Sequence, residues 1–276
     1  MNKIDKKVDS LDPACLWLGQ FVKQGIKHPL ENSRIARSLC CLLTSGVSPQ
    51  SPQILGAIEH ILKLQHEDGG WTSTEETVWS LAALRVIMPE AISEWEAGCQ
   101  WLRSIKLTSN AWGQTERDIH RIPTTALVCE LVPELTDKRA IEWISQEWEK
   151  DLQEVVQLSY KAGFFLLAAG NKKEWVDSDL VEKTIEYLSK DQNDDGGFAP
   201  WKNHPIGSDP WSTGVVLWGL SKWGDRVDKQ IFKKALMWLR KSQLPCGVWP
   251  YHYLDDGTSM AVLGIVGAQI VLEGTI

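Results

Sequence analysis

The feature that most constrains the fold is a short internal repeat. The motif Q-x-x-x-G-x-W occurs as LQHEDGGW from residue 64, as DQNDDGGF from residue 191 and as SQLPCGVW from residue 242. Phe198 replaces the Trp in the second of these copies. A weaker fourth copy ends at Trp112, where Lys106 and Asn110 take the Gln and Gly places. A repeat of this kind indicates that one structural unit is used several times along the chain.

Apolar residues precede each motif at fixed distances. Ile58 and Ile61 lie seven and four positions before Gln65, and the other two close copies have the same arrangement. This spacing is typical of one face of an amphipathic helix. The glycine step ends that helix, because Gly adopts the left-handed conformation that closes a last turn. We therefore expect each Gln and aromatic side chain to fasten an outer helix to the inner helix that follows.

A second pattern, T-x-x-x-L-x-x-L, follows each turn. It begins at Thr77, Thr124 and Thr213, and less strictly at Ser259. These segments are small and apolar on most faces, which predicts buried helices. The hydroxyl residue stands where an N-cap or first-turn residue is expected.

Pairs of outer and inner helices fill the chain, so we predict an all-α fold. Outer helices are expected near 12–25, 52–66, 91–106, 137–153, 177–191 and 227–243, and inner helices near 33–45, 75–88, 122–134, 155–170, 210–223 and 257–272. Six pairs are enough to close a ring. Because no linker divides the chain, we expect one domain over residues 1–276, structured from roughly 11 to 272.

Composition limits the environment and the partners. A net charge of −7 and a pI near 5.4 argue against nucleic acid. No apolar run reaches the roughly 18–20 residues that span a bilayer, and the first ten residues lack a signal-peptide core. Cys15, Cys99 and Cys129 fit apolar helix faces, which favours reduced thiols and a cytoplasmic location. Peripheral contact with a membrane and the oligomeric state stay open.

Tryptophan is unusually frequent, with 15 residues in 276. Trp71, Trp112 and Trp249 end repeat turns, where packing is the simpler explanation. Trp79 and Trp218 lie on predicted inner helices, where packing and contact with a ligand in a central cavity are equally reasonable. The same holds for Trp211, at the start of an inner helix.

The repeat resembles the QW repeats of squalene-hopene cyclases, and also those of class II terpene cyclases and protein prenyltransferase β subunits. The resemblance covers nearly the whole chain and implies an (α/α)6 toroid. In the prenyltransferases, zinc is held by Asp, Cys and a His that precedes the Thr of an inner helix. Here Ser212 takes the His place and no Asp-x-Cys pair lies upstream, which argues against a zinc site.

In class II cyclases a D-x-D-D-T motif opens an inner helix, and its third residue donates a proton. STEET resembles this motif, with Glu75 in the third place and Glu76 in the fourth. YLDDGTS is a second candidate, in which Asp255 and Asp256 follow Tyr253. Neither segment has the first Asp. Paired carboxylates in an apolar cavity favour a protonated form, whereas a helix N-terminus favours the anion.

Three functions are compatible with these observations. The first is a class II terpene cyclase-like enzyme that protonates a linear isoprenoid, an apolar small molecule. Its catalytic residues are expected to be Glu75, Glu76, Asp255 and Asp256, and its carbocation-stabilising residues Trp79, Trp211, Trp218 and Tyr253. No cofactor is expected, apart from Mg²⁺ if the substrate carries a diphosphate. The second is a non-catalytic toroid that binds an isoprenoid or another apolar ligand. The third is a protein-interaction scaffold.

Overall fold

A computed structural model describes residues 11–27 and 32–274, and this part of the chain contains twelve α-helices and no strand. The outer helices are α1 (Asp12–Gly25), α3 (Pro52–Lys63), α5 (Ile92–Ser104), α7 (Lys138–Asp151), α9 (Ser178–Asp191) and α11 (Lys229–Ser242). The inner helices are α2 (Asn32–Thr44), α4 (Thr74–Ile87), α6 (Ile122–Leu131), α8 (Ser159–Gly170), α10 (Pro210–Ser221) and α12 (Leu254–Glu273). Two 3-10 turns, η1 (Pro133–Leu135) and η2 (Lys173–Trp175), follow α6 and α8.

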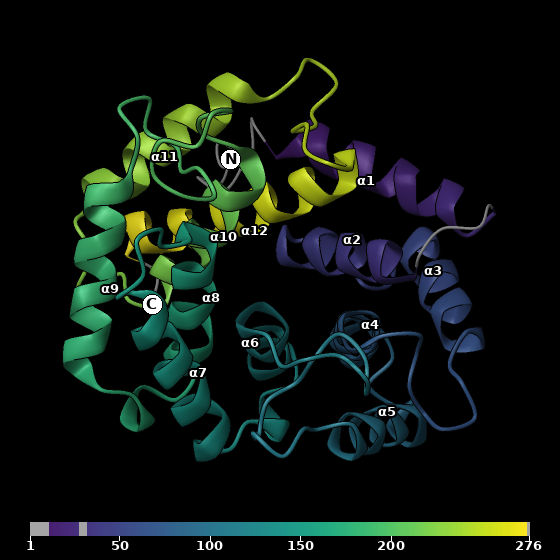
Figure 1. The fold of residues 1–276 in the computed structure, drawn as a ribbon. Coiled ribbons are helices and arrows are strands. Elements are labelled where there is room, and N and C mark those ends of the chain that lie inside the picture. Colours follow the sequence, from purple (N-terminus) through teal and green to yellow (C-terminus); the bar gives the residue numbers. More distant parts are fainter. Residues whose placement is uncertain (1–10, 28–31, 275–276) are drawn as a thin grey trace.

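The inner helices form a closed ring, which Figure 1 shows with the outer helices around it. Each inner helix contacts the next, and α12 contacts α2. The predicted all-α ring of six helix pairs is therefore confirmed. Four boundaries differ from the prediction by three or four residues: α8 begins at Ser159 rather than near 155, α12 begins at Leu254 rather than near 257, α3 ends at Lys63 rather than near 66, and α6 ends at Leu131 rather than near 134. At the start of α8, Ser159 donates its backbone N–H to Pro200 O, which satisfies one of the N–H groups that a helix start leaves without an intrahelical partner.

The repeat turns have the geometry that the glycines predict. Gly69, Gly196 and Gly247 have φ between 90° and 95°, and Asn110 takes the same left-handed region in the weaker copy. Trp71, which ends the first turn, is 1% exposed and donates its indole N–H to Ile61 O at 3.0 Å, in the last turn of its own outer helix. Trp112 and Trp249 are buried in the same way, with bonds to Leu102 O and Leu239 O.

Two of the repeat glutamines, Gln65 and Gln192, join their outer helix to the next outer helix, not to the following inner one as the sequence suggests. Gln65 Nε2 donates to Gly69 O at 2.7 Å and to Glu94 O, in the first turn of α5, at 2.8 Å. Gln192 makes the same pair of bonds, to Gly196 O and to Ile231 O in α11. An amide group satisfies carbonyls of two elements at once, and a carbonyl in the next outer helix is the second one within its reach.

Lys106 makes an equivalent connection in the weaker copy of the motif. Its ammonium group lies 2.6 Å from Asp137 Oδ2, and Asp137 is the N-cap of α7. An ion pair therefore replaces the amide link between successive outer helices at this position.

A threonine hydroxyl joins each repeat turn to the inner helix. The backbone N–H of Trp71 donates to Thr77 Oγ1, and that of Phe198 donates to Thr213 Oγ1. Trp112 uses Thr125, and Trp249 uses Thr258. The sequence pattern placed these anchors one residue off, at Thr124 and Ser259. The sequence pattern follows the spacing of the leucines. The backbone N–H of the turn instead donates to the hydroxyl group that faces the turn, which belongs to the neighbouring residue.

Among the helices of residues 11–27 and 32–274, none is long and apolar enough to cross a membrane. All six cysteines are free thiols.

Candidate functional site

A cavity of about 460 Å³ lies at the end of the ring where the inner helices begin. The residue two positions before the anchoring Thr lines this cavity on four inner helices. These residues are Glu75, Pro123, Trp211 and Asp256. With Thr258 as the anchor, Asp256 occupies on α12 the place that Glu75 occupies on α4. The structure thus brings the two predicted acidic segments together at one cavity.

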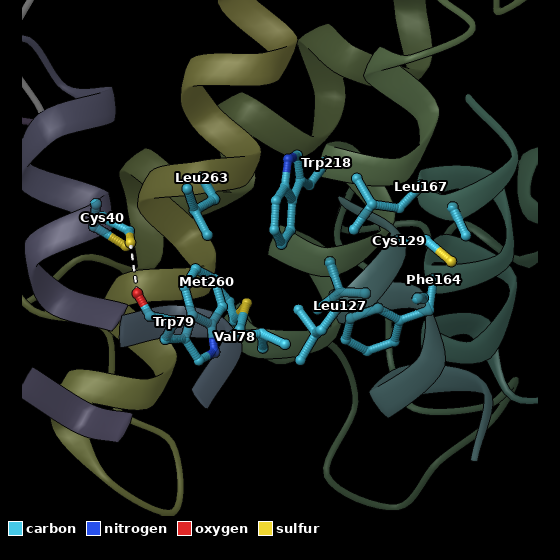
Figure 2. Close-up of a cluster of buried hydrophobic side chains, with 14 of the residues drawn as sticks. Cys40, Val78, Trp79, Leu127, Cys129, Phe164, Leu167, Trp218, Met260 and Leu263 are labelled. Atoms are coloured by element: carbon cyan, nitrogen blue, oxygen red, sulfur yellow. Dashed lines mark hydrogen bonds between the residues drawn. The ribbon is translucent and has the colours of Figure 1, made fainter. Parts of the chain in front are cut away.

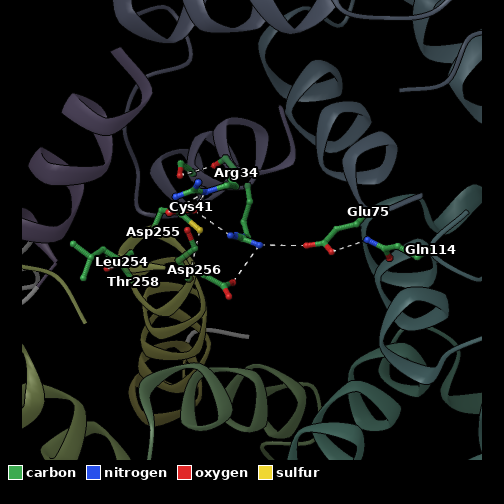
Figure 3. A network of polar contacts seen from close by, with 11 residues as sticks. Arg34, Cys41, Glu75, Gln114, Leu254, Asp255, Asp256 and Thr258 are labelled. Atoms are coloured by element: carbon green, nitrogen blue, oxygen red, sulfur yellow. Dashed lines mark hydrogen bonds and ion pairs between the residues drawn. The ribbon is translucent and has the colours of Figure 1, made fainter. Parts of the chain in front are cut away.

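Arg37 of α2 holds three carboxylates at this cavity. Figure 3 labels these carboxylates, which belong to Glu75, Asp255 and Asp256. Its Nη1 atom lies 3.2 Å from Glu75 Oε1 and 3.2 Å from Asp256 Oδ1. Its Nη2 atom lies 3.2 Å from Asp255 Oδ2. Burial alone would lower the pKa of Arg37, but the negative charges of Asp256, Glu75 and Asp255 raise it above its ordinary value. The guanidinium therefore stays charged although its side chain is only 7% exposed.

Asp255 is held by two arginines. Its side chain is 1% exposed, and Arg34 Nε donates to both carboxylate oxygens at 3.2 and 3.1 Å. Arg34 Nη2 and Arg37 Nη2 add further charged hydrogen bonds. Multiple donors on one carboxylate fix its orientation as well as its position. Asp255 is thus a buried counter-ion that holds the two guanidinium groups in place.

Asp256 has a different environment, although it is adjacent in sequence. Its side chain faces the cavity, and burial raises its pKa above the ordinary value. Arg37 opposes this rise, the carboxylates of Glu75 and Asp255 add to it, and a hydrogen bond from Trp211 opposes it again. The balance favours the protonated form of Asp256 more than that of an ordinary aspartic acid.

Glu75 and Glu76 begin α4 and also line the cavity. Glu75 is more open than Asp256, with 29% of its side chain exposed against 18%. It accepts hydrogen bonds from Arg37 and, at 3.4 Å, from Gln114 Nε2. The backbone N–H of Glu76 donates to Ser73 Oγ, which caps the helix.

Aromatic and aliphatic side chains form another part of the wall. Trp211 stacks on Tyr251 with ring centroids 5.7 Å apart and packs against Phe164 at 6.0 Å. Tyr253 also borders the cavity, but the guanidinium of Arg34 lies 4.4 Å above its ring. That contact occupies one aromatic face with a cation of the protein itself.

Trp79 and Trp218 do not share the cavity of the carboxylates. They stack on each other at 6.2 Å in a buried cluster between α4, α10 and α12 (Figure 2). They line a second cavity, of about 860 Å³, at the end of the ring where the inner helices finish. Leu127, Phe164 and Met260 border the first cavity from the other side of this cluster. The interior of the ring is thus divided into two compartments.

The sequence interpretation missed the arginines and Phe164. The segment NSRIARSLCCLLT contains a signal for them, because Arg34 and Arg37 are three residues apart on an otherwise apolar helix. A buried arginine needs a carboxylate partner, so this pair predicts acidic residues on neighbouring helices. Phe164 has no such signal, since most residues of its helix are apolar.

Comparisons with known proteins support the fold. Neither a protein-family model nor a curated protein matches the sequence. Among solved structures, the substrate-free type II terpene cyclase MstE from Scytonema is similar, with a TM-score of 0.72 and 15% identity over 98% of this chain and 99% of that one. A variant of MstE in complex with its substrate, geranylgeranyl dihydroxybenzoate, has a TM-score of 0.70 and 14% identity over 97% and 100%. The unsaturated glucuronyl hydrolase from Bacillus sp. GL1 has a TM-score of 0.68 and 12% identity over 97% of each chain. At these identities the similarity establishes an α/α toroid fold that is also used by enzymes.

Proposed function

We propose that the protein is a class II terpene cyclase-like enzyme in which Asp256 donates the proton that starts cyclisation of a linear isoprenoid. The observation that supports this proposal is the contrast between the two adjacent aspartates. Asp255 is enclosed by Arg34 and Arg37, whereas Asp256 faces the cavity with a raised pKa. A proton donor needs both access to the substrate and a pKa that keeps it protonated. The similarity to type II terpene cyclases favours an isoprenoid as the substrate.

In this mechanism the carboxyl proton of Asp256 moves to an alkene carbon of the substrate, and the new carbocation is attacked by the next double bond. The reaction ends when solvent or the Asp256 carboxylate accepts a carbon-bound proton, or when water adds to the carbocation and the oxonium ion gives its proton to solvent or to that carboxylate. Arg37 stabilises the Asp256 carboxylate until solvent returns its proton. The faces of Trp211 and Phe164 stabilise positive charge along the chain. A cavity of about 460 Å³ is within the common range of roughly 300–1,000 Å³ for ligand sites.

The proposal gives the other predicted residues different roles. Glu75 and Asp255 are ion-pair partners that hold Arg37, and Glu76 lines the cavity. Trp79 and Trp218 line the other cavity and are not part of this mechanism. No cofactor takes part, and Mg²⁺ enters only with a diphosphate-bearing substrate.

The test compares Asp256→Asn with Glu75→Gln on purified protein. Linear isoprenols and isoprenyl diphosphates of several lengths would be incubated with each variant, and extracts analysed for cyclic products. Asp256→Asn should abolish product while substrate binding remains, because an amide supplies no proton. Glu75→Gln should keep activity at acid pH but lose it at a lower pH than the parent protein does, because one of the negative charges that raise the pKa of Asp256 is removed. Loss with Glu75→Gln alone would move the acid to STEET. Binding without turnover by the parent protein would favour the non-catalytic toroid, and neither binding nor turnover would favour the interaction scaffold.

A second candidate function is acid-catalysed hydrolysis of an unsaturated glycoside. The polar part of the cavity wall favours it, since Ser33, Gln114 and Thr124 offer hydrogen bonds that a hydrocarbon does not use. The similarity to an unsaturated glucuronyl hydrolase points in the same direction. Unsaturated uronyl disaccharides therefore belong in the same assay, and their turnover in place of isoprenoids would decide for this function.

A further inference from the structure

The second cavity lies apart from the proposed acid. Its volume is about 860 Å³, and Trp79, Trp218 and Leu263 border it from within the ring. The first cavity, lined by Glu75 and Asp256, is the acidic cavity. The stacked Trp79–Trp218 pair belongs to the buried cluster that separates the second cavity from the acidic cavity (Figure 2). A ligand here would therefore not reach Asp256, which lines only the acidic cavity.

One wall of this cavity is formed by the C-terminal turns of α12. That helix has 20 residues, whereas the other inner helices have 10 to 14. Its last turns present Val266, Ile270 and Val271 to the cavity, and Ile270 is 39% exposed. Apolar side chains that face an open cavity gain free energy when a ligand removes them from water. The wall thus favours an apolar chain.

The mouth of the cavity is polar and carries an excess of positive charge. Lys173 and Lys229 are exposed residues that line it, and Lys222 lies deeper, 2.8 Å from Glu130. Its lining contains these three lysines against Glu130 and Asp225, although the whole chain has a net charge of −7. An anionic group at the mouth would therefore meet a local field opposite to that of the protein as a whole.

We propose that this second cavity binds a single-chain amphipathic anion. Its apolar chain lies along Trp218 and the end of α12, and its carboxylate or phosphate lies near Lys173 and Lys229 at the mouth. This site is independent of the proposed acid chemistry. It fits an isoprenoid acid as well as a fatty acid, because both combine a slender apolar body with an anionic head.

The experiment is calorimetric titration of the full chain with dodecanoate, with dodecanol as the uncharged control. Val266→Phe fills the cavity, and Val86→Phe makes the same change at a residue that is 51% exposed and lines neither cavity. Ile270→Ser removes apolar surface without overpacking. It replaces Val266→Phe in the titration if Val266→Phe has a lower melting temperature than the parent protein. Lys173→Gln with Lys229→Gln tests the charge. Asp256→Asn tests whether the ligand is in the acidic cavity instead.

The parent protein should bind dodecanoate at one site and more tightly than dodecanol. Val266→Phe, Ile270→Ser and the double lysine variant should each weaken binding by about tenfold, while Val86→Phe and Asp256→Asn leave it unchanged. Absence of saturable binding would overturn the proposal, as would equal binding by Val266→Phe and Val86→Phe. Loss of binding in Asp256→Asn would place the ligand in the acidic cavity. Equal affinity for dodecanol and dodecanoate would overturn the anionic class of ligand. None of these outcomes depends on cyclase activity.

Discussion

Glu75 and Asp256 approach the same nitrogen, Arg37 Nη1, each at 3.2 Å. They come from α4 and α12, the two inner helices that flank α2 in the ring. One guanidinium group thus faces two cavity carboxylates as well as the buried Asp255. Since one positive charge balances one carboxylate, and Arg34 and Arg37 together balance two, three carboxylates leave a surplus negative charge. Protonation of Asp256 removes it.

Asp255→Asn should destabilise the fold strongly. The substitution removes the buried carboxylate to which Arg34 and Arg37 both donate, so each guanidinium group loses charged hydrogen bonds. Breaking a buried ion pair in this way costs about 3–5 kcal/mol. Urea unfolding monitored by circular dichroism would measure the change. Asp225→Asn, at an exposed position, is the matched control, and equal stability of the two variants would show that Asp255 does not hold the arginines.

Turnover should decrease as the pH rises through the raised pKa of Asp256, because only the protonated acid starts the reaction. Stability should respond in the same direction. The folded state holds this proton more tightly than the unfolded chain, so the stabilising contribution is complete below the ordinary pKa of 3.8 and is lost as the pH rises through the raised pKa.

Asp256→Asn lacks this titration. The free energy of unfolding of the parent minus that of Asp256→Asn should therefore decrease from acid to neutral pH. Urea denaturation of both proteins across this range would measure the difference. A difference that stays constant with pH would show that the folded and unfolded states have the same pKa at this residue.

Thr258→Val should destabilise the protein by about 1–3 kcal/mol, because the buried N–H of Trp249 loses its acceptor while the shape of the side chain is kept. Ser259→Ala should change stability by less than about 0.5 kcal/mol, since the Ser259 hydroxyl makes no hydrogen bond within the described residues. Thermal melts of the two variants would compare them. The reverse order would restore Ser259 as the anchor of the last inner helix.

Trp71→Ala and Trp249→Ala should each cost about 3–5 kcal/mol, as truncations of fully buried aromatic residues do. Each also leaves a carbonyl of an outer helix without its indole donor. Met237→Ala, at a side chain that is 68% exposed, is the control in the denaturation series. Unchanged melting with lost activity would mean that these tryptophans contact a ligand.

The helix pairs could be predicted from the sequence because periodicity and glycine turns are local signals. The exact partner of Gln65 could not, since Glu94 O lies 29 residues away and is a backbone atom that carries no sequence signature. Asp256 was among the predicted acids, but its difference from Asp255 depends on which side chain faces Arg34 across 221 residues of sequence. A one-residue error in the anchoring threonine hid the equivalence of Asp256 and Glu75.

The Arg34–Asp255 contact joins the first inner helix to the last, so it closes the ring. The links between outer helices, made by Gln65, Lys106 and Gln192, are different. Each connects two outer helices that follow one another along the chain. The acidic cavity is different, because three of its charged residues come from the two ends of the chain. This site therefore exists only while α2 and α12 are in contact across 221 residues of sequence, and local opening of that contact would disable it with the other helix pairs still packed.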